Sequence, residues 1–308
     1  MIILLIISLI EINIYSNKDT YLIGEDILVW WEIVNRGKEV DYIKLKGPAL
    51  KLLNDCKIWD IDGNKVEHMR ISDVKGVIID RENKIKNNKR AYGREIEPGD
   101  TIFGVSKSDL FRDMNLIGFF GSLHFGGIAT SYIESGEYFY CMFYWTGKDA
   151  SNKVWSDTLH FFIIEPTGVE KEAFNLYKEF KKYKLNDGNA LVQYAFNFLE
   201  KYPESIYVSS LFRNLSIYLS VINGMKGYED IKENMYISTV KFVNYLEKNI
   251  DKFIIEERKL KGVLICIMYS KLILGVSKEE VKKEVNNLIT NLKLPVDNDI
   301  KEFFGINN

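Results

Sequence analysis

The arrangement of apolar and polar residues changes once along the chain, close to Pro166. Before that point, short runs rich in β-branched and aromatic residues, such as residues 27–34, end at turn residues. After it, apolar residues recur with the spacing of one helix face, beginning with Ala173, Phe174, Tyr177 and Phe180. The pattern predicts an all-β domain over residues 11–166 followed by an all-α domain over residues 167–308.

Turn residues divide the first domain into several short strands. Asp62-Gly63 predicts a hairpin. Pro98 and Gly99 stand where a type II turn favours them, with a strand expected over residues 101–105. Further strands are expected over residues 137–145 and 154–164. Many short strands with turns between them are typical of a β-sandwich.

The second domain shows six amphipathic segments joined by short breaks. Thr167 with Glu170, and Ser277 with Glu280, have the spacing of capping boxes, and Ser205 can cap a third helix. One long helix is expected over residues 229–248 and another over residues 252–274. Six helices make three antiparallel pairs, which predicts a helical-hairpin array.

Three segments of the first domain resemble bacterial immunoglobulin-like domains. They are YLIGEDILVWWEIVNRG (residues 21–37), IEPGDTI (residues 96–102) and SGEYFYCMFYW (residues 135–145). The resemblance covers most of residues 11–166 and implies an immunoglobulin-like β-sandwich with a binding or spacer role. No cysteine lies in the expected second strand, so the intersheet disulfide of antibody domains is not expected.

The segment FLEKYPESIYVSSLFRNLSIYL (residues 198–219) resembles the tetratricopeptide-like (TPR-like) repeats of bacterial envelope proteins, in which a K-Y-P-x-S turn joins two helices. The L-G-x-x-Y element of full repeats is missing. The resemblance implies a degenerate TPR-like array that offers a concave surface to a protein or peptide.

The first ten residues, Met1–Ile10, are all apolar except for Ser8. They match the apolar region of a secretory signal, although no basic residue precedes them and no cleavage motif follows. The alternative is a buried first strand. A signal would place the protein outside the cell or in the cell envelope; otherwise it would be cytoplasmic. No other segment suggests a transmembrane span.

Charge and cysteine content narrow the function only slightly. The net charge of −2 gives no indication of nucleic-acid binding. Cys56 and Cys141 both fall in the β domain and could pair, whereas Cys266 reads as a small buried hydrophobe.

No catalytic, metal or cofactor motif stands out. His68, His124 and His160 lack the spacing of metal ligands, and His160 sits in an alternating strand. The segment Asp60–Asn64 resembles part of a calcium loop but has no closing glutamate, so a hairpin is expected instead. We therefore expect no metal site and no cofactor.

Two segments could contact a partner. The glycine-rich stretch over residues 118–127 could present Phe119, Phe120, His124 and Phe125, or bury these rings in the core. A basic segment could contact an anionic partner, but a solvated insertion loop is the preferred interpretation; its cationic residues are Arg81, Lys84, Lys86, Lys89, Arg90 and Arg94.

The leading hypothesis is a non-enzymatic protein-binding module, exported or bound to the cell envelope, whose partner is another protein or peptide. One alternative is a peptidase inhibitor or accessory domain. Another is an enzyme whose site lies at the domain join.

Overall fold

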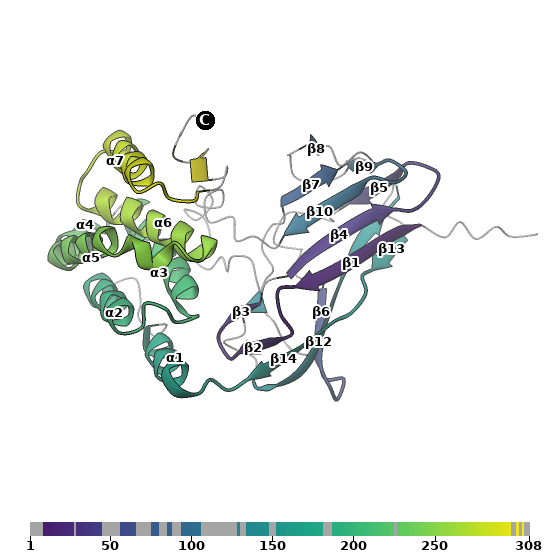
Figure 1. Cartoon of the computed structure of the whole chain (residues 1–308), viewed down its shortest axis with the longest axis horizontal. Coiled ribbons are helices and arrows are strands. Elements are labelled where there is room, and N and C mark those ends of the chain that lie inside the picture. Colours follow the sequence, from purple (N-terminus) through teal and green to yellow (C-terminus); the bar gives the residue numbers. More distant parts are fainter. Residues whose placement is uncertain are drawn as a thin grey trace, which may run out of the picture. The chain divides into compact units, whose positions relative to one another are not determined.

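The computed structural model in Figure 1 describes residues 9–27, 29–44, 56–65, 75–79, 85–87, 94–105, 128–129, 134–147, 152–180, 187–224, 227–296, 300–301 and 304. The described residues form two compact units, and the chain passes from one to the other between Glu165 and Pro166. The first unit contains the strands and the second contains the helices. The chain is therefore a mixed β-plus-α protein in which strands precede helices.

The first sheet has five strands, and its neighbouring strands are antiparallel. Their order is β1 (Ile10–Ser16), β4 (Val29–Asn35), β10 (Thr101–Val105), β7 (Lys75–Ile79) and β8 (Ile85–Asn87). Ile10 is buried and pairs with Asn35, so β1 includes the last residue of the apolar start. Leu9 is exposed, and the remainder of the expected signal segment, residues 1–8, lies outside the described residues.

The second sheet is built around one long strand, β12 (Gly136–Thr146). One edge of β12 pairs with β14 (Leu159–Ile164) and β13 (Asn152–Trp155), and the other with β6 (Cys56–Asp60) and β5 (Asp41–Lys44). β9 (Arg94–Ile96) extends the sheet beyond β5, and β2 (Thr20–Leu22) pairs with β14 in parallel. A short separate ladder joins β3 (Asp26–Ile27) to β11 (Ile128–Ala129).

The two large sheets share one hydrophobic core. The first contributes residues from β1 and β4, and the second contributes residues from β2, β6, β9, β12 and β14. Because side chains alternate across a strand, each sheet turns only one set of positions toward this core. The core members are Ile10, Ile12, Ile14, Tyr21, Ile27, Ile33, Ile58, Ile96, Tyr138, Tyr140, Phe161 and Ile163.

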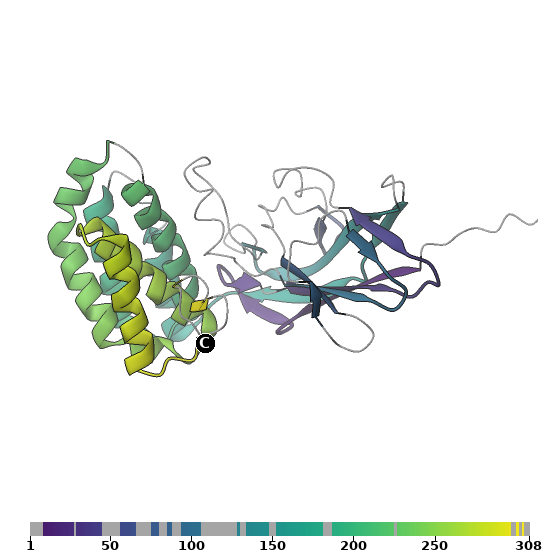
Figure 2. The same cartoon turned by 90° about the horizontal axis from the view of Figure 1, so that it is seen from above.

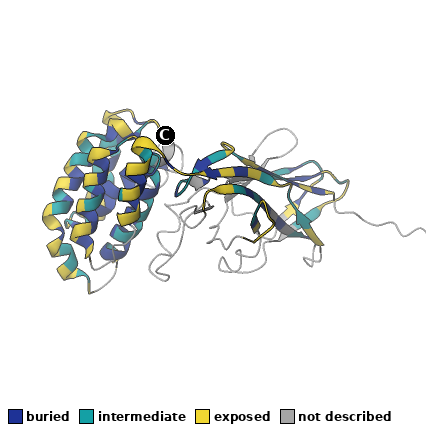
Figure 3. Ribbon diagram, turned by 90° about the horizontal axis from the view of Figure 1, so that it is seen from below, coloured by how far each residue is buried: buried dark blue, intermediate teal, exposed yellow. Residues whose placement is uncertain are grey.

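The helical unit begins with α1 (Gly168–Phe180), α2 (Gly188–Lys201) and α3 (Val208–Gly224). It continues through α4 (Glu229–Asn234), α5 (Tyr236–Lys248), a 3₁₀ turn at Ile250–Phe253, α6 (Glu257–Ile273) and α7 (Lys278–Asn291). α2 packs on α5, α3 packs on α6, and α6 also contacts α5 and α7. Figures 2 and 3 show these helices lying side by side, with buried residues between them and exposed residues outside.

Lys271 of α6 connects three helices. Its Nζ lies 2.8 Å from an Oε of Glu247 in α5 and 2.5 Å from an Oε of Glu284 in α7. Burial acts to lower the pKa of Lys271, but hydrogen bonds to Glu247 and Glu284 outweigh it and raise the pKa above 10.5. The charged lysine therefore contributes to helix packing.

Several local expectations are confirmed. Ser277 accepts a hydrogen bond from the Glu280 amide at 3.2 Å, and Ser205 accepts one from the Tyr207 amide. At the type II turn, the Asp100 amide donates to the Glu97 carbonyl, and Gly99 has φ +82°.

Three expectations about element boundaries are wrong. The helix expected over residues 229–248 is broken at Met235, a fully buried residue that lies against Gly188 of α2. The strand expected over residues 154–164 is divided where Asp157 accepts a hydrogen bond from the Ile14 amide. The expected basic loop contains two strands, because Lys86 lies in β8 and Arg94 in β9.

Candidate functional site

One face of the second sheet is turned away from the shared core and is rich in aromatic rings. Tyr138 and Tyr140 of β12 point into the core. By alternation, the odd-numbered residues of β12 lie on the opposite face. They are Glu137, Phe139, Cys141, Phe143 and Trp145.

The neighbouring strands add further rings to this face. Phe139 pairs with Trp59 of β6 on one side and with His160 of β14 on the other. Phe143 pairs with Trp155 of β13. We use the term aromatic face for the rings of Trp59, Phe139, Phe143, Trp145, Trp155, His160 and Phe162.

The rings at one end of the aromatic face stack across three strands. The centroids of Trp59 and Phe139 lie 5.9 Å apart with planes 16° from parallel. Those of Phe139 and His160 lie 4.9 Å apart with planes 13° from parallel. Phe162 meets His160 edge to face at 4.8 Å and is 38% exposed. Solvent therefore reaches this end of the face.

Two lysines cover the rings at the other end. Lys153 Nζ lies 3.5 Å from the centroid of Phe143 and 4.3 Å from that of Trp155. Lys57 Nζ lies 4.6 Å from the centroid of Trp155. An ammonium group over a ring face is attracted by the negative charge of that face. Both lysines are exposed, whereas Phe143 beneath them is buried.

His160 makes a polar contact as well as ring contacts. Its Nε2 lies 2.7 Å from Oε1 of Glu137, and both side chains are partly exposed. The sequence predicts a packing or surface role for this histidine, and the contacts agree with that interpretation. The pair is a polar contact between neighbouring strands, because Glu137 belongs to β12 and His160 to β14.

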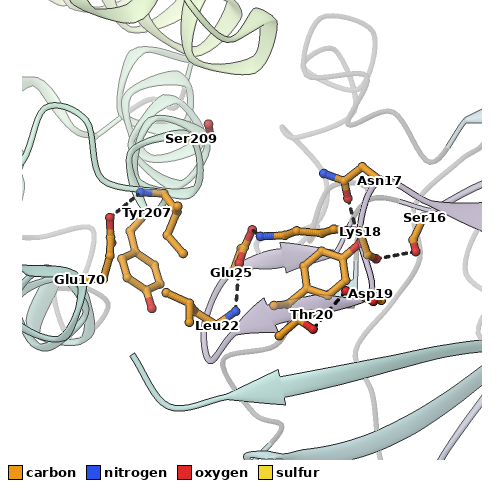
Figure 4. Close-up of polar contacts among 12 residues, drawn as sticks. Ser16, Asn17, Lys18, Asp19, Thr20, Leu22, Glu25, Glu170, Tyr207 and Ser209 are labelled. Atoms are coloured by element: carbon orange, nitrogen blue, oxygen red, sulfur yellow. Dashed lines mark hydrogen bonds and ion pairs between the residues drawn. The ribbon is translucent and has the colours of Figure 1, made fainter. Parts of the chain in front are cut away.

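The segment that begins the immunoglobulin-like resemblance forms a closed polar turn (Figure 4). The buried Tyr21 donates its hydroxyl proton to Asn17 at 2.8 Å. Glu25 accepts from the Leu22 amide at 2.9 Å and forms an ion pair with Lys18. Gly24 takes the positive φ of +83° that this turn requires. These polar groups therefore position β2 beside β14 and have a structural role.

Asn35 links the N-x-G turn (residues 35–37) to the P-G-D turn (residues 98–100), the two other turns that resemble those of immunoglobulin-like domains. Its buried side chain donates to the carbonyls of Glu39 and Ile96, each at 2.8 Å, and accepts from the Gly37 amide. Its backbone amide donates to the Asp100 carbonyl at 3.1 Å. The N-x-G and P-G-D turns thus form one hydrogen-bonded corner.

In the helical unit, Glu170 does not complete the expected capping box with Thr167. Its carboxylate instead accepts from Ser205 Oγ at 2.8 Å and from the Ile206 amide at 3.4 Å. The first amides of a helix have no hydrogen-bond acceptor within the helix, which explains why a carboxylate is favoured beside the start of α3. Glu170 therefore connects α1 to α3.

The segments proposed from the sequence as partner contacts are mostly undescribed. Phe119, Phe120, His124 and Phe125 lie outside the described residues, as do His68, Arg81, Lys84, Lys89 and Arg90. Their roles stay predictions. Of the basic set, only the backbones of Lys86 and Arg94 are described, in the strands noted above.

Cys141 is a free, buried thiol opposite Lys57 in the ladder, not opposite Cys56. Burial raises the pKa of Cys141, and the nearby charges of Lys57 and Lys153 act in the opposite direction. Cys266 is also free, and complete burial raises its pKa strongly. The disulfide that the sequence left open between Cys56 and Cys141 is therefore absent.

Asp60 has the role expected of a hairpin residue. Its carboxylate accepts from the amide and the side chain of Asn64, at 2.7 and 3.0 Å, which lowers the pKa of Asp60. Gly63 has φ +82°, as the turn requires.

Within the described ranges, no group of three or more metal-ligating side chains comes together. No described helix has the length and apolar character needed to cross a bilayer.

The aromatic face was not predicted from the sequence, although a signal for it was present. In GEYFYCMFYW, aromatic residues occur at both odd and even positions, so both faces of the strand carry rings. A strand with one solvated face should alternate apolar and polar residues. The missing alternation in residues 137–145 is therefore the sign of a second apolar face.

Comparison with known proteins identifies no family. No family model matches the chain, and no curated protein matches it. Among solved structures, it is similar to Spo0M, a sporulation control protein from Bacillus subtilis, with 11% sequence identity and a TM-score of 0.25. The match covers 56% of this chain and 56% of the Spo0M chain.

Proposed function

We propose that the protein is a non-enzymatic, exported binding module that attaches to another protein through the aromatic face. The single observation that carries this proposal is the ring-rich outer surface of a sheet whose opposite surface already forms the core. His160 and Phe162 are exposed, and the other rings of the face except the buried Phe143 are half-buried. Contiguous apolar groups that solvent reaches mark interaction sites, because isolated exposed apolar residues are common but contiguous ones are costly. Aromatic residues are also enriched at protein interfaces.

Strand order supports an immunoglobulin-like sandwich as the frame of this surface. The order β1-β4-β10-β7 corresponds to A-B-E-D of such domains, and β14-β12-β6 corresponds to G-F-C. On this assignment the aromatic face is the outer surface of the G-F-C sheet. The parallel pairing of β2 with β14 adds a strand beside G.

Helix packing supports a TPR-like hairpin array in the second unit. We assign the hairpins as α1 with α2, α3 with α5, and α6 with α7. Two pairs of equivalent helices from successive hairpins then pack together, α3 on α6 and α2 on α5. The rings of Phe174 and Tyr177 in α1 stack on Tyr207 at the start of α3. This relation between neighbouring hairpins is what a repeat array requires.

Site-specific photo-crosslinking tests the binding proposal. A benzoylphenylalanine replaces Phe162 in the full chain, which is expressed in the cell that makes it. The matched control carries the same group at Tyr236, which is 52% exposed on α5. We expect a discrete protein adduct from position 162 and a weaker one or none from position 236. Equal adducts at both positions, or none at 162, would contradict the proposal.

Export has a separate test. We expect mass spectrometry of the native protein to find an N-terminus beyond Met1 in the envelope or external fraction. A chain that retains Met1 in the cytosolic fraction would overturn the export part of the proposal and leave the binding part standing.

A further inference from the structure

We propose that the aromatic face binds an extended, acidic peptide segment, with carboxylates at the lysine end and apolar side chains at the Phe162 end. This inference rests on the proposed function and specifies the chemistry of the partner. Three observations carry it: the orientation of the rings, the charge on the face, and its length along β12.

Ring orientation favours a peptide over a carbohydrate. Sugars bind aromatic residues by lying flat on a ring face. Here the rings of Trp59, Phe139 and His160 stack on one another, which closes the faces between them. At the other end, the ammonium group of Lys153 occupies a face of Phe143. What the stack offers a ligand is ring edges, which carry partial positive charge and attract oxygen atoms and other ring faces.

The charge on the face favours a negative ligand. Lys57 and Lys153 approach the same ring, Trp155, at 4.6 and 4.3 Å. Among the residues that the structure describes, neither lysine forms an ion pair with a carboxylate. The face does contain one carboxylate, Glu137, but it is already paired with His160. The two ammonium groups are therefore available to carboxylates of a ligand without competition from that pair.

The length of the face suits an extended segment. From Glu137 to Trp145, β12 rises about 26 Å at roughly 3.3 Å per residue. An extended peptide of about eight residues covers that distance, and alternate side chains of such a peptide point to one side. A segment in which every second residue is apolar or acidic can place both kinds of group on the face.

A designed peptide series tests this inference with the full chain. The probe is the 12-residue peptide (Phe-Ser)₃(Glu-Ser)₃. When it is extended, its phenyl and carboxylate groups lie on one side, with the phenyl groups toward one end and the carboxylates toward the other. The matched peptides carry Gln or Lys in place of Glu. Binding is measured by calorimetry and by tryptophan fluorescence, to which Trp59, Trp145 and Trp155 of the face contribute three of the five indoles. We expect the Glu peptide to bind more tightly than the Gln peptide, and the Lys peptide to bind most weakly.

Protein variants locate the binding. The double variant Lys57→Glu, Lys153→Glu should weaken binding of the Glu peptide by about fivefold or more at low salt, given two exposed ionic contacts, and by less at high salt. The matched control is Lys178→Glu, since Lys178 also lies over a ring, Phe174, at 4.7 Å, but in the helical unit. This control should bind as the unaltered chain does. Circular dichroism and thermal unfolding confirm that each variant is folded.

The outcomes separate this inference from the proposed function. Equal binding of the Glu and Gln peptides, or no binding of any peptide, would overturn the acidic specificity. An adduct at position 162 would still support protein binding in either case. Binding of a neutral oligosaccharide that the Phe162→Ala substitution abolishes would overturn both the peptide inference and the proposed protein partner.

Discussion

Gly262 of α6 lies against Phe212 of α3, and no space for a methyl group remains between them. A Cβ built on Gly262 would stand 2.5 Å from Cβ of Phe212. Phe212 is fully buried, and its ring meets Phe253 edge to face at 5.2 Å. The ring and the backbone beneath it therefore cannot move away without disturbing the packing of α3 on α6.

Gly262→Ala should lower the free energy of unfolding, because the added methyl group forces α3 and α6 apart. The expected loss is about 1–3 kcal/mol, the usual cost of overpacking a core. Gly224→Ala is the matched control, since nothing lies within 4 Å of a Cβ at the end of α3. Urea unfolding followed by circular dichroism measures both variants. A stability of Gly262→Ala equal to that of the control would show that α3 and α6 are farther apart than described.

Asn35→Ala should destabilise the β unit. The substitution removes three side-chain hydrogen bonds at a site that is 2% exposed, and it leaves the carbonyl of Ile96 without its donor. We expect a loss of about 2–3 kcal/mol, the cost of leaving buried polar groups unpaired. Asn291→Ala, at an exposed position that ends α7, is the control. Thermal unfolding of the two variants should differ clearly; equal unfolding temperatures would mean that the corner does not depend on Asn35.

Lys271→Met should destabilise the helical unit by about 1 kcal/mol at neutral pH, since the ion pairs are only partly buried. The pKa of Lys271 is raised by folding, so its contribution is complete below the unfolded value of 10.5 and is lost as pH rises through the folded value. Urea unfolding at pH 7 and above pH 11 should therefore show a difference from the unaltered chain that shrinks at the higher pH. Lys283→Met, an exposed change on α7, should show little difference at either pH.

Cys141 and Cys266 should react with thiol reagents only when the protein unfolds. In a Cys56→Ser variant, a disulfide reagent added to the folded protein should label neither Cys141 nor Cys266, because both are buried and burial raises the pKa of each. In guanidinium both should react. Rapid labelling of the folded variant would place one of these thiols at the surface.

The order of strands and helices could be predicted from the sequence because it depends on local periodicity, as at Ala173, Phe174 and Tyr177 on one face of α1. The positions of turns could also be predicted, as the positive φ angles of Gly63 and Gly99 show. The break at Met235 was not, because it depends on tertiary packing against Gly188. Strands β8 and β9 were missed because each has three residues beside a basic, polar segment, and pairing across the sheet overrides that local composition. Strand β7 (KGVII) is mostly apolar but was included in the same expected loop.

The candidate site was harder to predict than the fold. The sequence directed attention to His124 and the rings around it, which lie outside the described residues. The aromatic face depends on register, which brings Trp59 and His160 to either side of Phe139 from positions far apart in the chain. Register between distant strands is set by the whole sheet and cannot be read from one segment.

The parallel pairing of β2 with β14 has a mechanical consequence. β2 follows β1 near the start of the chain, and β14 leads directly to α1. Tension applied between the N-terminus and the helical unit would pull these two strands in opposite directions along their axes. Their backbone hydrogen bonds, such as that from the Ile23 amide to the Ile164 carbonyl, would then bear the load together instead of breaking one at a time. A protein anchored at one end and attached to a partner at the other would resist extension at this ladder.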